Sequence, residues 1–171
     1  MLPNQRKIRV LVVDDSAVAR AFLIKGLSAY PYIEVVGYAI NALDAKAKIL
    51  RLHPDVMTLD VEMPGIDGME TARTLRERDA GVVIVFITNI ARYAVQGYEV
   101  EALDFILKPV SYFAFSVKMD RAVRRARQQA RHTVFLQLTD GMQMLDTQEI
   151  YYLETQSRML YYHTAKGVFK L

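Results

Sequence analysis

Short apolar runs that alternate with helix-forming stretches are the feature that most constrains the fold of this chain. Five runs rich in Val, Ile and Leu predict strands over residues 8–13, 33–38, 56–59, 82–87 and 103–107. Between and after them, helices are expected over about 16–29, 41–52, 68–78, 91–98 and 111–131. Strands that are apolar throughout are typical of parallel sheets covered on both faces. The alternation therefore predicts an α/β fold, a doubly wound parallel sheet of five strand–helix repeats.

The first two helices each have a periodic apolar face that should pack on the sheet. The expected face residues are Val18, Phe22, Leu23 and Leu27 in the first helix, and Leu43, Ala47 and Leu50 in the second. This is the spacing of side chains on one side of an α-helix.

The pattern changes near residues 131–133. Short apolar segments follow at 135–138, 142–145, 150–154, 159–163 and 168–171, with turn residues between them. One turn contains Asp140-Gly141, a strong hairpin signal. We therefore expect one domain over residues 1–131 and an incomplete antiparallel β segment over residues 133–171. A segment this short rarely buries a core unaided, and its strand edges would need a partner.

Composition excludes several kinds of protein. The chain has no cysteine, so disulfides and thiolate metal sites are ruled out. No apolar run approaches the roughly 20 residues of a membrane span, and no signal peptide is visible, so we expect a cytoplasmic protein. The net charge of +3 is concentrated in residues 118–131. Contact with DNA phosphates is one interpretation of that basic helix, but a solvated helix feeding a linker is the one we favour.

Five polar residues follow the predicted strands, at the point where each strand ends. They are Asp14 and Asp15, Asp60, Thr88 and Lys108. Because the carboxyl ends of parallel strands meet at one edge of a sheet, these side chains should converge on one crevice. Three carboxylates together need a cation, and oxygen ligands with open positions favour Mg²⁺. A lysine and a hydroxyl beside them suit a phosphoryl group.

This set of residues also predicts the chemistry. A carboxylate can act as a nucleophile and accept a phosphoryl group, giving an acyl phosphate. Mg²⁺ and Lys108 would neutralise charge on the transferring group. Asp60, which follows the third strand, is the expected acceptor.

In order and spacing, Asp14-Asp15, Asp60, Thr88 and Lys108-Pro109 resemble the receiver domains of two-component response regulators. The resemblance covers residues 8 to about 131 and implies a flavodoxin-like (βα)5 fold. It implies that Asp60 is the phosphoacceptor, that Asp15, Asp60 and the backbone carbonyl of Glu62 bind Mg²⁺ directly, and that Asp14 helps through water. It further implies that Lys108 binds the phosphoryl group, that Thr88 reorients toward it, and that Phe105 is the switch aromatic residue. A sensor histidine kinase would be the partner, and the chain would not be an enzyme.

Two positions depart from the family pattern. Asn89 follows Thr88 where a small residue is commoner, so it is expected to narrow access to Asp60 or alter hydrolysis of the acyl phosphate. Phe105 lacks the hydroxyl of the commoner tyrosine, so a switch there would work by packing alone.

The resemblance differs along the chain. Residues 7–20 and 53–64 are similar to the receiver of the chemotaxis methylesterase family, whereas residues 68–79 and 86–113 are similar to LytTR-type regulators. Residues 133–171 resemble the start of a LytTR DNA-binding domain. We expect DNA binding only from a complete output domain, and no DNA-contacting residue is assigned. The mosaic is compatible with natural divergence or with a constructed chimera, and a joined sequence is the hypothesis we adopt.

The sequence is compatible with three functions. The leading prediction is a response regulator that controls transcription through a LytTR output truncated here. The alternative is the receiver of a chemotaxis methylesterase, which predicts a downstream α/β esterase where this chain has short β segments. A third is an engineered scaffold with an inert site. Phosphorylation would shift a population of conformers and alter a homodimer face formed by the fourth helix, fifth strand and fifth helix.

Overall fold

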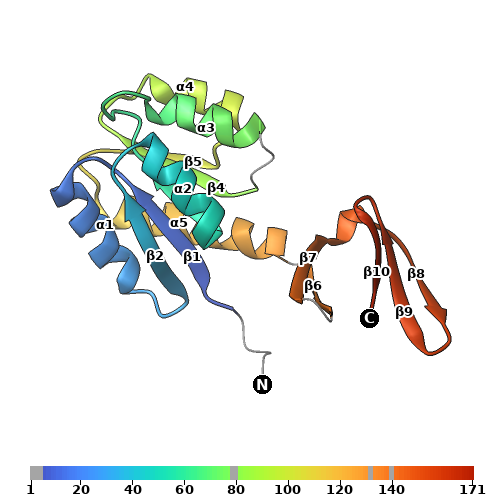
Figure 1. Cartoon of the computed structure of the whole chain (residues 1–171). Helices are drawn as coiled ribbons and strands as arrows, with labels where there is room; N and C mark the ends of the chain where they lie inside the picture. The colour runs from blue at the N-terminus through green and yellow to red at the C-terminus, as the bar shows by residue number, and fades with distance from the viewer. Residues whose placement is uncertain (1–5, 78–80, 131–132, 139–140) are drawn as a thin grey trace. The chain divides into compact units, whose positions relative to one another are not determined.

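The structure is a computed structural model that describes residues 6–77, 81–130, 133–138 and 141–171 (Figure 1). It divides into two compact units, Met1–Ala126 and Arg127–Leu171. The predicted Asp140-Gly141 turn falls partly outside the described residues.

The first unit is built on a five-stranded parallel sheet with strand order β2-β1-β3-β4-β5. Its strands are β1 (Ile8–Val13), β2 (Ile33–Ala39), β3 (Val56–Leu59), β4 (Val83–Thr88) and β5 (Asp104–Leu107). The helices between and after them are α1 (Ala17–Ser28), α2 (Ala42–Leu52), α3 (Gly68–Glu77), α4 (Tyr93–Gly97), the 3-10 turn η1 (Tyr98–Val100) and α5 (Tyr112–Ala130). The predicted flavodoxin-like doubly wound fold, a five-stranded parallel sheet with alternating helices, is confirmed.

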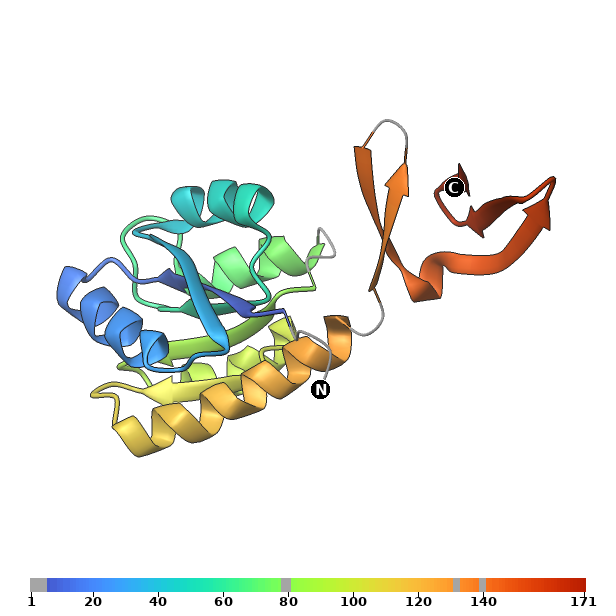
Figure 2. The same ribbon diagram turned by 90° about the horizontal axis from the view of Figure 1, so that it is seen from below.

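Two hydrophobic clusters lie on opposite faces of this sheet. Along β1, Val10 and Val12 point into one cluster, while Leu11 and Val13 point into the other, as the two-residue period of a strand requires. The first cluster is completed by α1 and α5, and the second by α2, α3 and η1. Figure 2 shows α1 and α5 on one side of the sheet and α2 and α3 on the other. Burial on both faces explains why most residues of the strands are apolar.

The predicted faces of the first two helices are partly wrong. In α1, Leu23 and Leu27 are buried as expected, but Val18 is 82% exposed and Phe22 is 52% exposed. In α2, the predicted face points to solvent: Leu43 is 78% exposed and Leu50 is 68% exposed. The buried residues of α2 are Ala42, Ala45 and Ile49, and the last two belong to the second cluster. Small alanines allow α2 to approach the sheet closely, and a pattern based on large side chains overlooks them.

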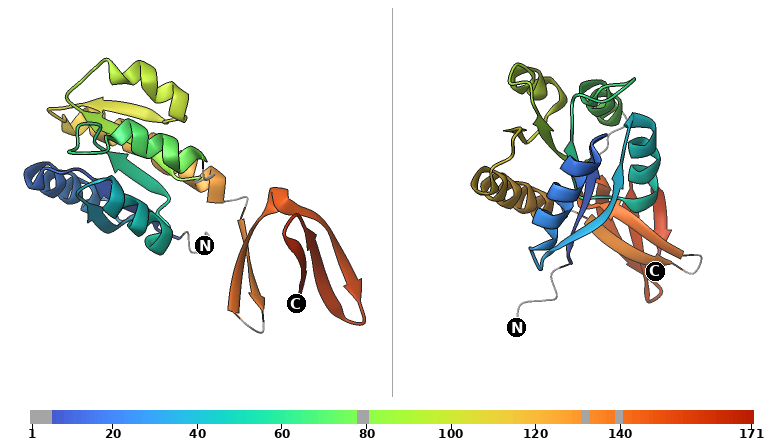
Figure 3. Two further views of the ribbon diagram at one scale, coloured as in Figure 1. Left: turned by 45° about the horizontal axis from the view of Figure 1, so that its top comes forward. Right: turned by 90° about the vertical axis from the view of Figure 1, so that its left-hand side faces the viewer.

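The second unit consists of antiparallel strands, as predicted. A hairpin pairs β6 (Thr133–Leu138) with β7 (Gly141–Asp146). After the 3-10 turn η2 (Thr147–Glu149), a three-stranded sheet follows with the order β10-β9-β8. Its strands are β8 (Ile150–Gln156), β9 (Met159–Thr164) and β10 (Gly167–Lys170) (Figure 3). Among the helices that the structure describes, none is long and apolar enough to cross a membrane.

Candidate functional site

Three carboxylates meet at the carboxyl edge of the sheet. Asp14 and Asp15 follow β1, and Asp60 follows β3, the neighbouring strand. Each offers an oxygen that lies within 4.8 Å of the oxygens of the other two. Asp14 is 1% exposed and Asp60 is 4% exposed, whereas Asp15 faces solvent. The parallel topology therefore brings residues 46 positions apart into one acidic cluster.

Lys108, which follows β5, lies between two of these carboxylates. Its Nζ donates to Asp14 Oδ2 at 2.8 Å and to Asp60 Oδ2 at 2.9 Å. The backbone of Lys108 is held in turn, because its amide donates to the carbonyl of Thr88 at 2.8 Å. The lysine thus offsets part of the repulsion between two buried acids.

Burial and the ion pair between Asp60 and Lys108 act in opposite directions on the pKa of each of these two residues. Burial raises the pKa of the Asp60 carboxyl above its usual value, and the nearby charge of Asp14 adds to that, although Lys108 and the amide of Glu62 oppose it. For Lys108, burial alone would lower the pKa, but the hydrogen bonds and charges of Asp14 and Asp60 outweigh burial and raise it. The lysine therefore remains a cation at neutral pH.

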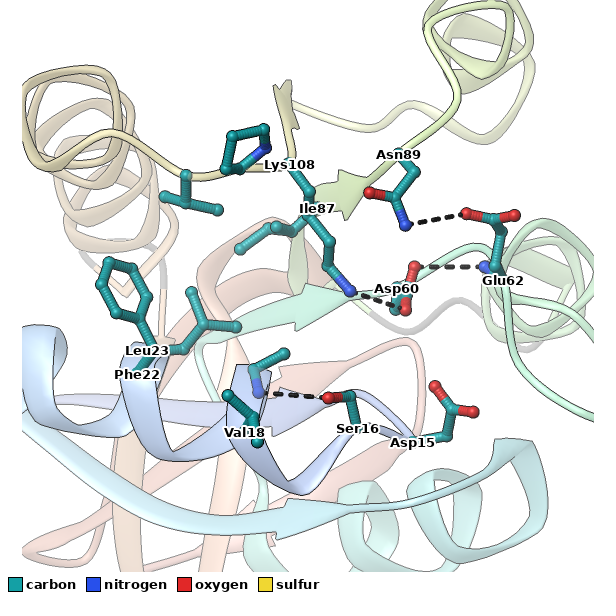
Figure 4. Close-up of a pocket in the computed structure, with 13 residues that line it drawn as sticks. Asp15, Ser16, Val18, Phe22, Leu23, Asp60, Glu62, Ile87, Asn89 and Lys108 are labelled. Atoms are coloured by element: carbon teal, nitrogen blue, oxygen red, sulfur yellow. Dashed lines mark hydrogen bonds and ion pairs between the residues drawn. The ribbon is translucent and has the colours of Figure 1, made fainter.

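A cavity of about 640 Å³ opens beside the acidic cluster (Figure 4). Its polar wall contains Asp15, Asp60, Glu62, Asn89 and Lys108. Its apolar wall comes from Val18, Phe22 and Leu23 of α1, together with Ile87, Pro109 and Val110. The exposure of Val18 and Phe22, which contradicts their predicted place in the core, follows from this position. Asp60 lies in the wall of this cavity, so a small ligand in the cavity would reach it.

Asn89 and Glu62 form a bridge at this cavity. Asn89 Nδ2 donates to Glu62 Oε2 at 3.3 Å, and the amide of Glu62 donates to Asp60 Oδ1 at 3.1 Å (Figure 4). The bridge links the loop after β3 to the loop after β4. It lies where the sequence predicts that Asn89 would narrow access to Asp60.

The acidic cluster has the donors that Mg²⁺ prefers. All three side chains offer carboxylate oxygens, and Mg²⁺ is a hard cation that is usually bound by one or two carboxylates plus water. The carboxylate of Asp15 makes no hydrogen bond or ion pair with the described residues, so its oxygens are available to a cation. The residues present therefore fit the predicted ion.

Thr88 and Phe105 lie near the site but outside the cavity lining. Thr88 is buried, and its Oγ1 accepts from the amide of Ile90 at 3.5 Å. Phe105 is half-buried, and its ring lies 6.4 Å from that of Phe86, centroid to centroid. Thr88 is the last residue of β4, whereas Phe105 is the second residue of β5, where it pairs with Phe86.

Two residues near the site were missed by the sequence reasoning. Ser16 caps α1 through its side chain, which accepts from the amide of Ala19, and its own amide donates to Asp14 Oδ1 at 2.9 Å. Arg20 donates to the carbonyls of Asp14 and Asp15. No sequence signal identifies Arg20, because its partners are backbone atoms that any residue type would present.

The basic helix is partly neutralised within the first unit. Lys118 Nζ lies 2.7 Å from Asp104 Oδ1, and Arg121 Nη1 lies 3.0 Å from Asp104 Oδ2. These two cations therefore have an acidic partner on β5. That arrangement agrees with the solvated-helix interpretation better than with contact to DNA phosphates.

Comparison with known proteins identifies the first unit. Residues 10–115 match the response regulator receiver domain family. A protein-glutamate methylesterase/protein-glutamine glutaminase of Syntrophotalea carbinolica is 43% identical over 117 residues, which cover 66% of this chain and 33% of the relative. The enzyme of the same name from Halalkalibacterium halodurans is 47% identical over 108 residues, 61% of this chain and 31% of the relative. The chain therefore spans about a third of the length of these curated relatives.

Solved structures give the same result. The response regulator domain of Thermotoga maritima CheB superposes with a TM-score of 0.61 at 34% identity, covering 72% of this chain and 96% of that domain. The response regulatory domain of mrkE from Klebsiella pneumoniae superposes with a TM-score of 0.67 at 28% identity, covering 71% of this chain and 100% of that domain.

These comparisons correct two predictions. The prediction that the chain is not an enzyme is wrong, because the curated relatives are named as enzymes, although the matches cover only the receiver part of them. The predicted LytTR half, with its DNA binding, transcriptional role and chimeric origin, receives no support; the methylesterase alternative fits the relatives better.

Proposed function

The chain belongs to the response regulator receiver family, and from that membership we propose that it is a phospho-accepting switch whose acceptor is Asp60. The phosphoryl group would come from the phosphohistidine of a sensor histidine kinase. We also propose that the receiver occupies residues 1–131 and that residues 133–171 form a separate β domain.

One observation carries this proposal: Lys108 Nζ bridges Asp14 and Asp60 at 2.8 and 2.9 Å, with Asp15 in the same cluster. A lysine fixed on an acceptor carboxylate is poised to meet the oxygens of an incoming phosphoryl group. A purely structural ion pair would not need a third carboxylate that faces solvent beside a cavity.

The residues have separable roles in the transfer. An Asp60 carboxylate oxygen attacks phosphorus, the bond from phosphorus to the histidine nitrogen breaks, and the electron pair of that bond returns to the imidazole. Lys108 pairs with the phosphoryl oxygens and so exchanges a carboxylate partner for a phosphate partner. Asp14, Asp15, Asp60 and the backbone carbonyl of Glu62 would hold Mg²⁺, which when bound supplies positive charge for the transferring group.

The response would spread through Thr88 and Phe105. The Thr88 hydroxyl, which accepts a long hydrogen bond of 3.5 Å from the amide of Ile90, would turn toward the phosphoryl group. Phe105 would repack beside Phe86, and the face formed by α4, β5 and α5 would change. A homodimer through that face is part of the proposal, since Val95, Tyr98 and Phe113 are exposed on it.

The test uses a small-molecule phosphodonor. Incubating the chain with acetyl phosphate and Mg²⁺ should add one phosphoryl group, detected by intact mass, and chelating Mg²⁺ should prevent it. Asp60→Asn should abolish the modification, whereas Asp67→Asn, a nearby acid outside the cluster, should not. Modification that persists in Asp60→Asn, or its absence in the parent, would overturn the proposal.

A second candidate concerns the output that the switch controls. The curated relatives favour a receiver that regulates a methylesterase-type enzyme. The receiver of the Syntrophotalea carbinolica relative can be exchanged for the matching part of this chain. If the candidate is right, acetyl phosphate should change methanol release from methyl-esterified protein by the hybrid, and Asp60→Asn should remove the response. A hybrid that is active but insensitive to phosphodonor would contradict it.

A further inference from the structure

The loop that carries the two acids after β1 is held by a residue of α1. Arg20 Nη1 donates to the carbonyl of Asp14 at 2.9 Å and to the carbonyl of Asp15 at 3.0 Å. One guanidinium nitrogen thus pins two successive peptide carbonyls. Without a donor there, two carbonyl oxygens would be turned toward the same point, which costs free energy.

The two acids depend on this contact to different degrees. Asp14 is fixed at every polar group: its amide donates to the Ala39 carbonyl at 3.1 Å, and its two carboxylate oxygens accept from Ser16 and Lys108. The carboxylate of Asp15 makes no such contact with the described residues, and the residue is exposed. For Asp15, the hydrogen bond from Arg20 is therefore the contact that sets the position of its backbone.

Arg20 is itself oriented by an aromatic ring. Its guanidinium carbon lies 4.9 Å from the centre of the Tyr38 ring, at the end of β2. Lys48 of α2 lies 5.2 Å from the centre of the same ring and donates to the Tyr38 carbonyl. Asp44 pairs with Lys48 at 3.0 Å. Two cations thus contact the Tyr38 ring. Cation–π contacts of this kind limit how a guanidinium can turn.

We propose that Arg20 is a positioning residue for the metal site: its guanidinium, held by Tyr38, fixes the Asp14–Asp15 backbone so that the Asp15 carboxylate stays in the acidic cluster. This inference rests on the proposed function, because it gives the acidic cluster a Mg²⁺ ion to bind. Contacts that orient the ligands of a metal typically change metal affinity by about 10- to 100-fold when they are lost.

Charge repulsion alone predicts the opposite change in Mg²⁺ affinity when Arg20 is removed. Arg20 is a cation near a site for another cation, so removing it should strengthen Mg²⁺ binding if only Coulomb repulsion mattered. If Arg20 acts by positioning, removing it should weaken Mg²⁺ binding. The direction of the change therefore separates the two effects.

The experiment titrates Mg²⁺ into the metal-free full chain by calorimetry. Arg20→Gln should weaken binding by about tenfold, and Arg20→Lys, which keeps the charge but not the planar fork, should fall between it and the parent. Arg51→Gln is the matched control, since Arg51 is an exposed arginine of α2 away from the cluster. Binding in Arg20→Gln that equals or exceeds binding in the parent would overturn the inference.

A second measurement needs no metal. Amide hydrogen exchange of Ser16, followed by NMR in the metal-free protein, should be faster in Arg20→Gln, while exchange in β3 and β4 should match the parent. Tyr38→Phe should behave as the parent, and Tyr38→Ser should shift toward Arg20→Gln. Equal exchange at Ser16 in all variants would overturn the inference. Failure of the parent to bind Mg²⁺ would overturn the proposed function as well, so the two failures are distinguishable.

Discussion

At the scale of single residues, Asp104 shows how charge is balanced away from the acidic cluster. Its carboxylate is 12% exposed and receives Lys118 at 2.7 Å and Arg121 at 3.0 Å. The amide of Phe105 also donates to it at 2.8 Å. Burial alone would raise the pKa of Asp104, but these hydrogen bonds and cations outweigh burial and hold the pKa below its usual value. Asp104 therefore stabilises the fold in its ionised form.

Asp104→Asn is expected to lower the free energy of unfolding by about 1–3 kcal/mol at neutral pH, because hydrogen bonds to charged partners are weakened. The carboxyl has a lower pKa folded than unfolded. Its stabilisation is therefore complete above the unfolded pKa, about 3.9, and is lost as pH falls through the folded pKa. Urea unfolding of parent and variant should show two stabilities that converge in acid. A difference that stays constant from neutral to acid pH would contradict the assignment.

The sequence predicted the residues of the acidic cluster better than the residues that hold them in position. Asp14, Asp60 and Lys108 could be predicted to meet because parallel strands end at one edge, whatever the loops do. Arg20 could not, because it binds backbone carbonyls and leaves no pairing of residue types in the sequence. The Asn89–Glu62 bridge is an intermediate case, since both residues were singled out from the sequence but the contact between their side chains was not.

At the scale of elements, the strands were predictable and the helix faces were not. A strand buried on both sides is apolar at most positions, so β1 and β4, with one polar residue each, are evident from composition alone. The sheet-facing side of α2 is built from alanines and Ile49, and its exposed side has larger apolar residues. Periodicity therefore favoured the wrong side. Similarly, the fourth helix, expected over about 91–98, begins only at Tyr93 and ends at Gly97, where the 3-10 turn η1 follows.

The first residue of α3 makes a close approach that ties this helix to the acceptor. A Cβ at Gly68 would lie 2.2 Å from the Asp60 carbonyl oxygen and 2.8 Å from the Val61 Cα. Gly68→Ala should therefore displace the start of α3 or the loop after β3. We expect a loss of about 1–3 kcal/mol in the free energy of unfolding, as for other overpacked sites, and slower phosphorylation by acetyl phosphate.

Gly81→Ala is the control for this substitution, because a Cβ at Gly81 would meet nothing within 4 Å. It should leave both stability and phosphorylation near the parent values. If Gly68→Ala also matched the parent in both measurements, close packing of α3 on the Asp60 backbone would not be a requirement of the site.

At the scale of the whole molecule, the site and its core belong to one unit. Every predicted site residue lies within Met1–Ala126, and so do both hydrophobic clusters. In the second unit, Leu136 and Leu145 are the apolar side chains buried among those the structure describes, while Phe135, Met142, Tyr151 and Val168 are exposed. The two units therefore differ in how much apolar surface each removes from water.

A chain shortened to residues 1–130 is expected to fold and to be phosphorylated on Asp60 at the rate of the full chain. The reason is that α5 contributes buried side chains to the first cluster as far as Ala126.

A chain cut after residue 118 is the contrasting fragment. The cut removes Met119, Ala122, Val123 and Ala126, which are all buried in the first cluster. The loss of several buried side chains is expected to exceed the whole free energy of unfolding of a domain, roughly 5–15 kcal/mol. Circular dichroism and acetyl phosphate labelling should show a folded, reactive 1–130 chain and an unfolded, unreactive 1–118 chain. Loss of folding or labelling in the longer fragment would mean that the receiver depends on the β segment, and equal behaviour of the two fragments would mean that the end of α5 is dispensable.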